Sequence, residues 1–229
     1  MPRDVLGQLQ AEVVRFRAWA DTYPAGRRSG EWETEYPHWE ALRAAFATFI
    51  DTTSYHDWSE DAIQLLLYAV ARDNEVEELA HLLGEHPCAL IFLADQGLQA
   101  AERDAAWQLA SQLGTLDLLQ AEPLLVRYVE HADEYVRRRA LLALGRLGSS
   151  QVEALAAKAW DSGEESQRIA ALCALEDVGS SRIREYAARD EALSTPGLAR
   201  YAAHIREAGT LRGFRVQGVP VIESAIDSA

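Results

Sequence analysis

Residues 134–156, EYVRRRALLALGRLGSSQVEALA, recur in altered form as residues 165–187, ESQRIAALCALEDVGSSRIREYA. At an offset of 31 residues the two segments share ten identities in 23 positions, against roughly two or three expected from a composition rich in alanine and leucine. Internal repeats of this length are typical of helical arrays, in which each unit buries its apolar face only against its neighbours. This pair of segments therefore decides the fold class.

Each copy predicts a helix, a turn at GSS and a second helix. Gly148 is expected to take the left-handed conformation that ends the first helix. Ser150 and Glu153 have the S-x-x-E spacing of a capping box, which would open the second helix. The later copy keeps Gly179 but has Arg184 in place of the glutamate, so its cap should be weaker. The apolar stripe of the first helix is Val136, Ala140, Leu144 and Leu147.

The same alternation continues on both sides with a looser register. One helix is predicted near residues 63–70, and a partner helix carries Val76, Leu79, Ala80 and Leu83. Pro87 and Pro123 are expected in the first turns of further helices. Apolar spacing also predicts helices over residues 6–16, 39–49 and 198–205, with a loop over 21–37. The tail 209–229 is expected to be loosely ordered or laid against the last helix. The fold class is all-α.

The stretch Asp133, Glu134, Tyr135, Val136, Arg137, followed by Ala140, Ala143, Leu144 and Gly148, resembles the pattern of HEAT-like repeats of the phycobilisome-lyase type. The match is good over 131–190 and partial over 57–130. It implies an α-solenoid with an N-terminal helical cap at 1–56, HEAT-like repeats at 57–208 and a C-terminal tail at 209–229. It also implies that Arg137 and Arg168 bond an acidic residue of their own or a neighbouring repeat, and that second helices line the concave side.

Charge separates the two halves of the chain. The 229 residues carry a formal net charge of -14, and residues 31–85 hold 13 acidic side chains against two basic ones. Such a balance disfavours nucleic acid as a partner. There is neither a secretory signal pattern nor an apolar run long enough to cross a membrane, so we expect a cytoplasmic protein with no membrane partner.

Catalytic and metal-binding motifs are not found. The sequence has no phosphate-binding glycine loop, no G-x-S-x-G and no H-E-x-x-H, and its histidines never fall four residues apart. Cys88 and Cys173 have no nearby cysteine or histidine companion, and we interpret both as core thiols. We therefore predict no enzyme activity, no metal and no cofactor.

Acidic and aromatic residues alternate in two segments, 31–36 and 57–61. Aromatic side chains supply contact area and carboxylates attract a basic partner, so this composition favours a binding surface. Trp39 lies on an apolar stripe and is interpreted as core, whereas Trp58 could equally staple a helix start at Ser59. The predicted partner-binding residues in these segments are Glu31, Trp32, Glu33, Glu35, Tyr36, Asp57, Trp58, Glu60 and Asp61.

A third acidic group lies off the apolar stripe of the second helix in the first pair. It consists of Glu75, Glu77, Glu78 and His81. A solvated helix face is the common explanation of such a group. The resemblance, however, places second helices on the concave side, where these residues would form a negative groove.

Two kinds of function follow. The first is a non-catalytic protein-binding α-solenoid that binds and occludes a basic partner protein, with the specific hypothesis of a cognate immunity protein that neutralises a bacterial toxin; this hypothesis comes from analogy with small acidic HEAT-like proteins. The alternative is a HEAT-like enzyme or pocket protein, either tetrapyrrole lyase-like or base-excision-like, or an assembly scaffold. Base excision is disfavoured because it needs a basic groove.

Overall fold

The computed structural model describes residues 4–27 and 32–212, and every regular element within those ranges is a helix. The all-α prediction is confirmed. The chain divides into two compact units, the first ending at Leu116 and the second beginning at Asp117. The tail beyond residue 212, for which loose order was predicted, lies outside the described residues.

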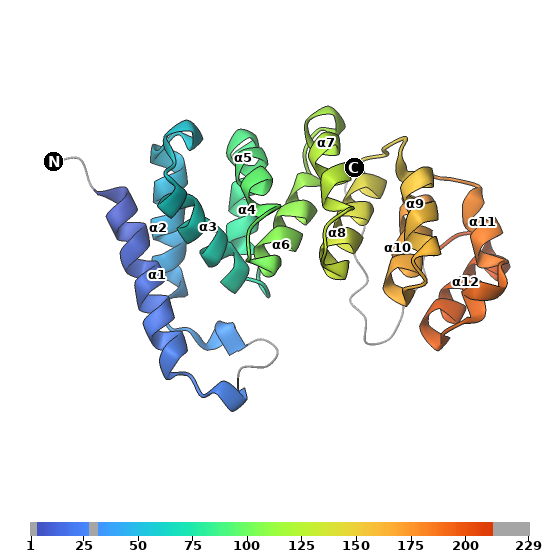
Figure 1. Cartoon of the computed structure of the whole chain (residues 1–229), viewed down its shortest axis with the longest axis horizontal. Coiled ribbons are helices and arrows are strands. Elements are labelled where there is room, and N and C mark those ends of the chain that lie inside the picture. Colours follow the sequence, from blue (N-terminus) through green and yellow to red (C-terminus); the bar gives the residue numbers. More distant parts are fainter. Residues whose placement is uncertain (1–3, 28–31, 213–229) are drawn as a thin grey trace. The chain divides into compact units, whose positions relative to one another are not determined.

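The first unit is built from two layers of helices (Figure 1). Helices α1, α3 and α6 pack successively in one layer, and α2, α4 and α5 pack against them in the other. Short 3₁₀ turns connect α1 to α2 and α2 to α3. Its elements are α1 (Val5–Thr22), η1 (Ala25–Arg27), η2 (Trp32–Glu35), α2 (Trp39–Thr52), η3 (Tyr55–Asp57), α3 (Glu60–Arg72), α4 (Glu78–Gly84), α5 (Pro87–Gly97) and α6 (Arg103–Leu113).

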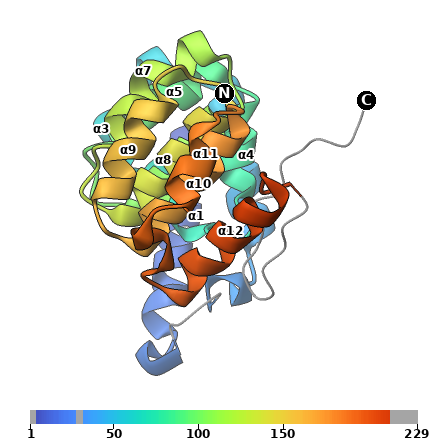
Figure 2. The same ribbon diagram turned by 90° about the vertical axis from the view of Figure 1, so that its right-hand side faces the viewer.

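The second unit repeats this arrangement more regularly. Helices α8, α10 and α12 pack in order, while α7, α9 and α11 pack on them as second helices. Helix α12 ends the described part of the unit and lies at the front of Figure 2. The elements are α7 (Leu118–Tyr128), α8 (Glu134–Arg146), α9 (Val152–Asp161), α10 (Glu165–Asp177), α11 (Arg182–Ala187), η4 (Asp190–Leu193) and α12 (Pro196–Ala208).

Small residues set the spacing between α8 and α10. A Cβ atom placed on Gly145 would lie 2.9 Å from the Cα atom of Ala174, closer than Cβ atoms normally approach. The two helices can therefore pack closely, and α10 is in turn covered by α9. The predicted stripe residues Val136, Ala140 and Leu144 of α8 are all buried.

The turns of the repeat are held by serine residues that differ from those predicted. Gly148 and Gly179 take positive φ angles of 68° and 66°, as expected. The turn before α9, however, is held by Ser149, whose buried hydroxyl donates to Glu122 of α7 and whose Oγ accepts from the backbone N–H of Gln151 at 3.1 Å. The N-cap residue of α9 is Gln151, and none of the described side chains caps this helix. The predicted capping box of Ser150 with Glu153 is therefore wrong.

Glu153 instead belongs to the next link of the same kind. The hydroxyl of Ser180 donates to Glu153 Oε1 at 2.5 Å, and Ser180 Oγ accepts from the N–H of Arg182. Each glutamate thus reaches from the second helix of one repeat to the turn of the next, at a sequence distance of 27 residues. We call the contacts Ser149–Glu122 and Ser180–Glu153 the serine–glutamate links.

Three other expectations were wrong. Pro123 lies inside α7 and not in its first turn, and the carbonyl four residues earlier belongs to Leu119, which is 89% exposed and can bond water instead. Val76 is 52% exposed because α4 begins only at Glu78.

Cys88, which was expected in the core, is exposed. Cys173 is half-buried, and burial, reinforced by Asp177, raises the pKa of its thiol to about 12.

Neighbouring serines in the first turn allow a matched test of the serine–glutamate links. S149A removes a buried hydrogen bond to a carboxylate and the acceptor of the Gln151 N–H, so we expect the free energy of unfolding to fall by about 1–3 kcal/mol. S150A changes an exposed residue and should stay within about 0.5 kcal/mol of the parent protein. Urea unfolding measures both. A larger loss of unfolding free energy for S150A than for S149A would show that Ser150 and Glu153 form the capping box after all.

Candidate functional site

A cavity of about 200 Å³ lies in the first unit, next to the C-terminal end of α3. Its walls come from η2, the start of α2 and the turn between α3 and α4. Five of its nine lining residues have acidic or basic side chains. The lining residues are Glu33, Thr34, Trp39, Arg43, Arg72, Asp73, Asn74, Glu75 and Val76.

Asp73 fixes the turn that forms one wall. Its buried carboxylate accepts from the backbone N–H of Leu79 at 2.8 Å and from Arg43 at 3.3 Å. Burial raises the pKa of Asp73, and the two hydrogen bonds with the Arg43 charge oppose that rise. Glu77, at the N-cap of α4, takes a positive φ of 56°. The chain between them must therefore turn sharply, which places Asn74 and Glu75 at the cavity.

The opposite wall is held by an indole hydrogen bond. The Nε1–H group of Trp39 donates to the backbone carbonyl of Glu33 at 2.8 Å and so ties η2 to the first residue of α2. The Trp39 ring also packs against Phe16 and Tyr36, with ring centroids 5.4 Å and 5.7 Å away. As predicted, Trp39 belongs to the packed interior, although part of it reaches the cavity.

Two arginines of the wall are already engaged by carboxylates. Arg43 pairs with Glu78 at 2.9 Å as well as with Asp73, and Arg72 pairs with Glu102 at 2.7 Å. The guanidinium of Arg72 also lies 5.2 Å from the ring centroid of Tyr68 on α3. These contacts fix both side chains and neutralise much of their charge.

Glu33 is the exceptional group of the cavity. It is 5% exposed, and its Oε2 atom has no hydrogen-bond partner among the residues that the structure describes. Burial raises the pKa of Glu33, and the neighbouring carboxylates of Asp104 and Glu75 raise it further. Its own backbone N–H and the Arg72 charge oppose that rise. A buried acceptor without a partner is costly, so an unfilled hydrogen-bonding position here needs a reason.

The structure brings two of the three predicted acidic groups together. Glu33 and Glu75 both line the cavity and interact electrostatically. Glu75 and Glu77 precede α4 and do not lie on its face, because that helix begins at Glu78. Trp32 is half-buried, while Glu35, Glu78 and His81 are exposed. Glu31 lies outside the described residues.

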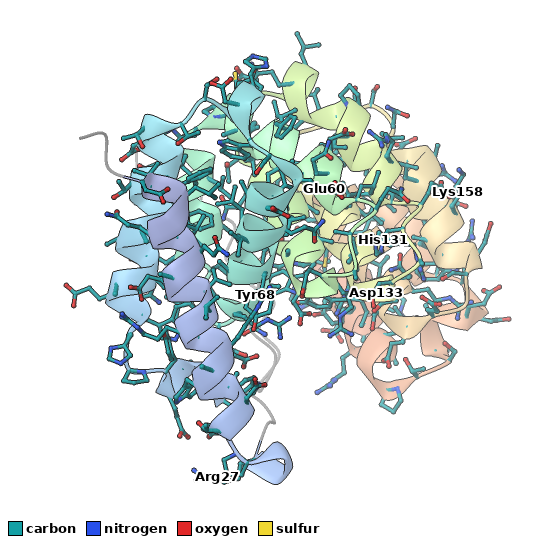
Figure 3. The ribbon with its side chains drawn as sticks, turned by 60° about the vertical axis from the view of Figure 1, so that its left-hand side comes forward. Arg27, Glu60, Tyr68, His131, Asp133 and Lys158 are labelled. Atoms are coloured by element: carbon teal, nitrogen blue, oxygen red, sulfur yellow. The ribbon has the colours of Figure 1, made fainter. Side chains whose placement is uncertain are left out.

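The third predicted group lies at the other end of α3. Glu60 and Asp61 occupy its first turn and Asp57 ends η3, and all three are exposed. Figure 3 shows Glu60 and Tyr68 toward opposite ends of this helix. Asp51, at the end of α2, faces the same region and pairs with His86 at 3.2 Å. We call Asp51, Asp57, Glu60 and Asp61 the acidic end of the first unit.

Three side chains predicted to contact a partner are buried instead. Tyr36 is 3% exposed and packs edge-on against Phe16 at 4.7 Å. Trp58 is 7% exposed and donates its indole N–H to the carbonyl of Thr53 at 3.1 Å, just before the α3 helix that Ser59 caps. Glu33 faces the cavity. Tyr36 and Trp58 therefore offer little outer contact area, because aromatic packing covers their surfaces, whereas a partner could reach Glu33 only through the cavity.

Sequence reasoning missed the residues that frame the cavity, namely Arg43, Arg72, Asp73 and Asn74. The sequence separation of the ion-pair partners could have identified Arg43, Arg72 and Asp73. Arg43 pairs with Asp73 and Arg72 pairs with Glu102, in each case 30 residues away and close to the repeat offset of 31. Ion pairs between equivalent positions of successive helix pairs are expected in an array of stacked units.

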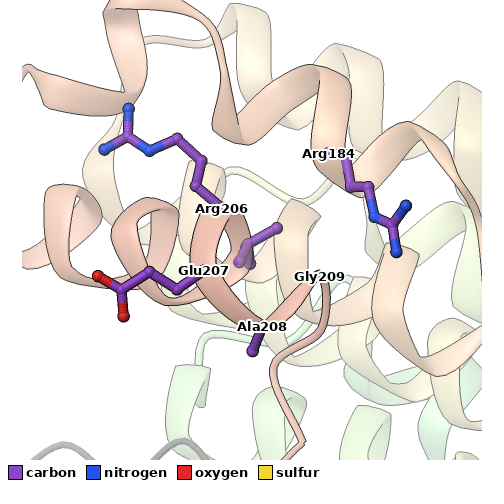
Figure 4. A pocket seen from close by; sticks show the side chains of 6 residues that line it. Arg184, Arg206, Glu207, Ala208 and Gly209 are labelled. Atoms are coloured by element: carbon purple, nitrogen blue, oxygen red, sulfur yellow. The ribbon is translucent and has the colours of Figure 1, made fainter.

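A larger hollow of about 380 Å³ near the end of α12 is a weaker candidate. In Figure 4 its charged side chains diverge: Arg206 and Glu207 extend to one side and Arg184 to the other. Convergent polar groups are what make a hollow a binding site. The described residues also contain no group of three or more histidine, cysteine, aspartate or glutamate residues placed to hold a metal ion.

A comparison with protein families identifies the repeats. Residues 93–189 match the family model described as HEAT repeats. This part of the chain is a HEAT-repeat region. No curated protein matches the sequence. HEAT repeats generally mediate contacts between proteins, which indicates a protein-binding scaffold.

No helix in the described ranges has the length and apolar character to cross a membrane.

The HEAT-repeat region contains the two arginines singled out by resemblance. Arg137 pairs with Glu164 of the next repeat at 3.0 Å and donates to the carbonyl of Ala132 at 2.8 Å, as expected. Arg168 donates to the carbonyl of Trp160 and to the hydroxyl of Ser194, at 3.0 Å and 3.2 Å, and pairs with no carboxylate in the described part of the chain. Both arginines therefore connect elements within the second unit.

The raised pKa of Glu33 predicts how stability depends on pH. An acid whose pKa is higher in the folded state lowers stability once the pH exceeds its unfolded value, and that loss disappears as the pH falls through this window. We expect E33Q to raise the melting temperature at pH 7, by about 2–4 °C for each kcal/mol of relief. The difference should vanish below about pH 4.

Scanning calorimetry at the two pH values checks this expectation. E40Q, which changes an exposed glutamate of α2, serves as control and should leave the melting temperature nearly unchanged at both. A lower melting temperature for E33Q at pH 7 would show that Glu33 is satisfied in the folded state and would contradict the description of the cavity.

Proposed function

We propose that this chain is a non-catalytic HEAT-repeat protein whose acidic end binds a basic partner protein and occludes part of that partner's surface. The observation that carries the proposal is that three of the four carboxylates at this end have no ion-pair partner among the described residues, while Asp51 pairs with His86. In the described residues Asp57, Glu60 and Asp61 are exposed and form no ion pair. The two basic residues of the window 31–85, Arg43 and Arg72, are engaged near the opposite end of α3.

Helix electrostatics alone could explain some of these carboxylates. Glu60 and Asp61 lie in the first turn of α3, where acidic residues are favoured by the helix dipole. That dipole amounts to about half a unit charge at the N-terminus. It cannot offset three full negative charges, so a strongly negative surface remains.

Aromatic groups lie beside the acidic end. Tyr55 of η3 and Phe92 of α5 are both half-buried, and their ring centroids are 5.6 Å apart. Trp58 supports Phe92 from the interior at 5.9 Å. A partly exposed aromatic pair next to carboxylates supports protein binding, because such rings contribute contact area while the charges steer the partner.

In its narrower form the proposal makes the partner a bacterial toxin domain and this chain its immunity protein. The support for that form is the chain's likeness, in size and acidity, to small acidic HEAT-like inhibitors. The broader form requires only that the partner be basic. Both forms expect association to be fast at low salt, on the order of 10⁸ M⁻¹s⁻¹, and slower as salt screens the charges.

The proposal is tested by capturing the partner and then reversing charge. The full chain is used as bait in extracts of its native cells at low and raised salt, and retained proteins are identified by mass spectrometry. We expect a basic protein whose retention falls with salt. With that partner purified, D57K/E60K/D61K should lower the association rate constant by at least about tenfold at low salt, with little effect on dissociation.

A control variant carries the same charge change elsewhere. D161K/E191K/E207K reverses three exposed carboxylates of the second unit and should slow association much less. Circular dichroism and melting temperature confirm that both variants fold. Equal slowing by the two variants would show that only net charge matters, and unchanged rates for both would overturn the proposal.

A further inference from the structure

We propose that the cavity beside α3 is the receptor for a single arginine side chain of the partner, whose guanidinium group bonds the carboxylates of Glu33 and Glu75. The inference rests on the proposed function, since the basic partner supplies the arginine. It goes beyond that function because it names a second contact, at the other end of α3 from the acidic end.

The size of the cavity limits its occupant. Sites for cofactors and drug-sized molecules usually measure about 300–1,000 Å³. This cavity measures about 200 Å³. It therefore suits one long side chain better than a whole cofactor, and Trp39 and Val76 provide apolar wall for the methylene stem.

The charge at the cavity favours a cation. Three carboxylates line it, from Glu33, Asp73 and Glu75, and two more, from Glu78 and Glu102, bond its arginines from outside. Against these five carboxylates, the lining residues include two basic side chains, Arg43 and Arg72. An anion would meet net repulsion, whereas a cation would restore the balance.

An independent observation points to a ligand at this position. The Oε2 atom of Glu33 is buried and has no hydrogen-bond partner among the described residues, and the residue as a whole is only 5% exposed. The Oδ1 atom of Asn74, on the opposite wall, is also buried without a partner. The two unfilled acceptors belong to residues of opposite walls, and the lining also holds two unfilled donors, the Nε atoms of Arg43 and Arg72. The guanidinium groups of both arginines are already paired with carboxylates, so an added donor-rich group would satisfy the acceptors of Glu33 and Asn74.

Guanidinium fits this pair of walls better than ammonium. Arginine carries five N–H donors in a planar fork, which can reach acceptors on two sides at once, while lysine presents a compact charge with three donors. Acceptors here come from η2 on one side and from the turn after α3 on the other. We therefore expect arginine to be preferred over lysine.

The test uses small probes on the full chain and needs no partner. N-acetyl-arginine methylamide is titrated while the indole N–H resonance of Trp39 is followed by NMR, because that group donates to the Glu33 carbonyl at the cavity. We expect saturable shifts with a dissociation constant of about 1 mM, a weak affinity suited to one side chain. The lysine analogue should bind more weakly, and the uncharged citrulline analogue should not bind.

Two variants make the result specific. E33Q keeps the size of the side chain and should weaken arginine binding by at least about tenfold. E60Q removes a carboxylate from the acidic end and should leave the affinity unchanged. E33Q is expected to remain folded, which its circular dichroism spectrum checks. Equal binding of the arginine probe to E33Q and to the parent chain, or equal binding of citrulline, would overturn the inference.

The failures of the two proposals are distinguishable. If the probe does not bind while partner capture remains salt-dependent and sensitive to D57K/E60K/D61K, the cavity is not the receptor but the acidic end still binds. If the probe binds and E33Q abolishes it while charge reversal at the acidic end has no effect, the cavity is a guanidinium site and the proposed function is wrong.

Discussion

Each helix pair of this chain can bury its apolar face only against the next pair, and the remaining features of the structure follow from that constraint. In the second unit the covering is close, since Gly145 of α8 meets the backbone of α10 at Ala174. Apolar packing is not directional and would tolerate a slip of one helix along another. The serine–glutamate links resist such a slip, because each hydroxyl must meet a carboxylate of the preceding repeat. Burial supplies the stability and these polar contacts fix the register.

The first unit uses charge for the same purpose. Arg43 and Arg72 reach residues 30 positions later, which join successive helix pairs as the serine–glutamate links do in the second unit. These pairs gather the cations of an acidic region at one end of α3. As a result, neither of these two arginines reaches the acidic end, and the cavity receives a surplus of carboxylates. Both candidate surfaces are therefore consequences of how the stack is held together.

Much of the fold follows from sequence because periodic apolar spacing and glycine turns are local signals. Gly148 and Gly179 were identified from their positions alone, as was the helix start at Ser59. The predictions that were wrong concern residues whose positions depend on contacts distant in sequence. Ser149 was overlooked in favour of Ser150, since its partner Glu122 lies in the previous repeat. Val76 was assigned to a helix because nothing local reveals that Asp73 caps the N–H of Leu79 and delays the helix start. The cavity could not be predicted from the sequence for the same reason, because the segments that form its walls meet only after folding.

The two ends of α3 act on a charged partner over different distances. The helix has 13 residues and is about 20 Å long, whereas the screening length at physiological salt is about 8 Å. Exposed carboxylates at the acidic end thus affect approach through solvent but have little influence on the cavity. Glu33 is shielded from water, so its charge acts strongly on whatever enters the cavity and weakly beyond it. A partner would be attracted by the first group and retained by the second. Because the groups share no contacts and lie more than a screening length apart, changes at one end should add to changes at the other.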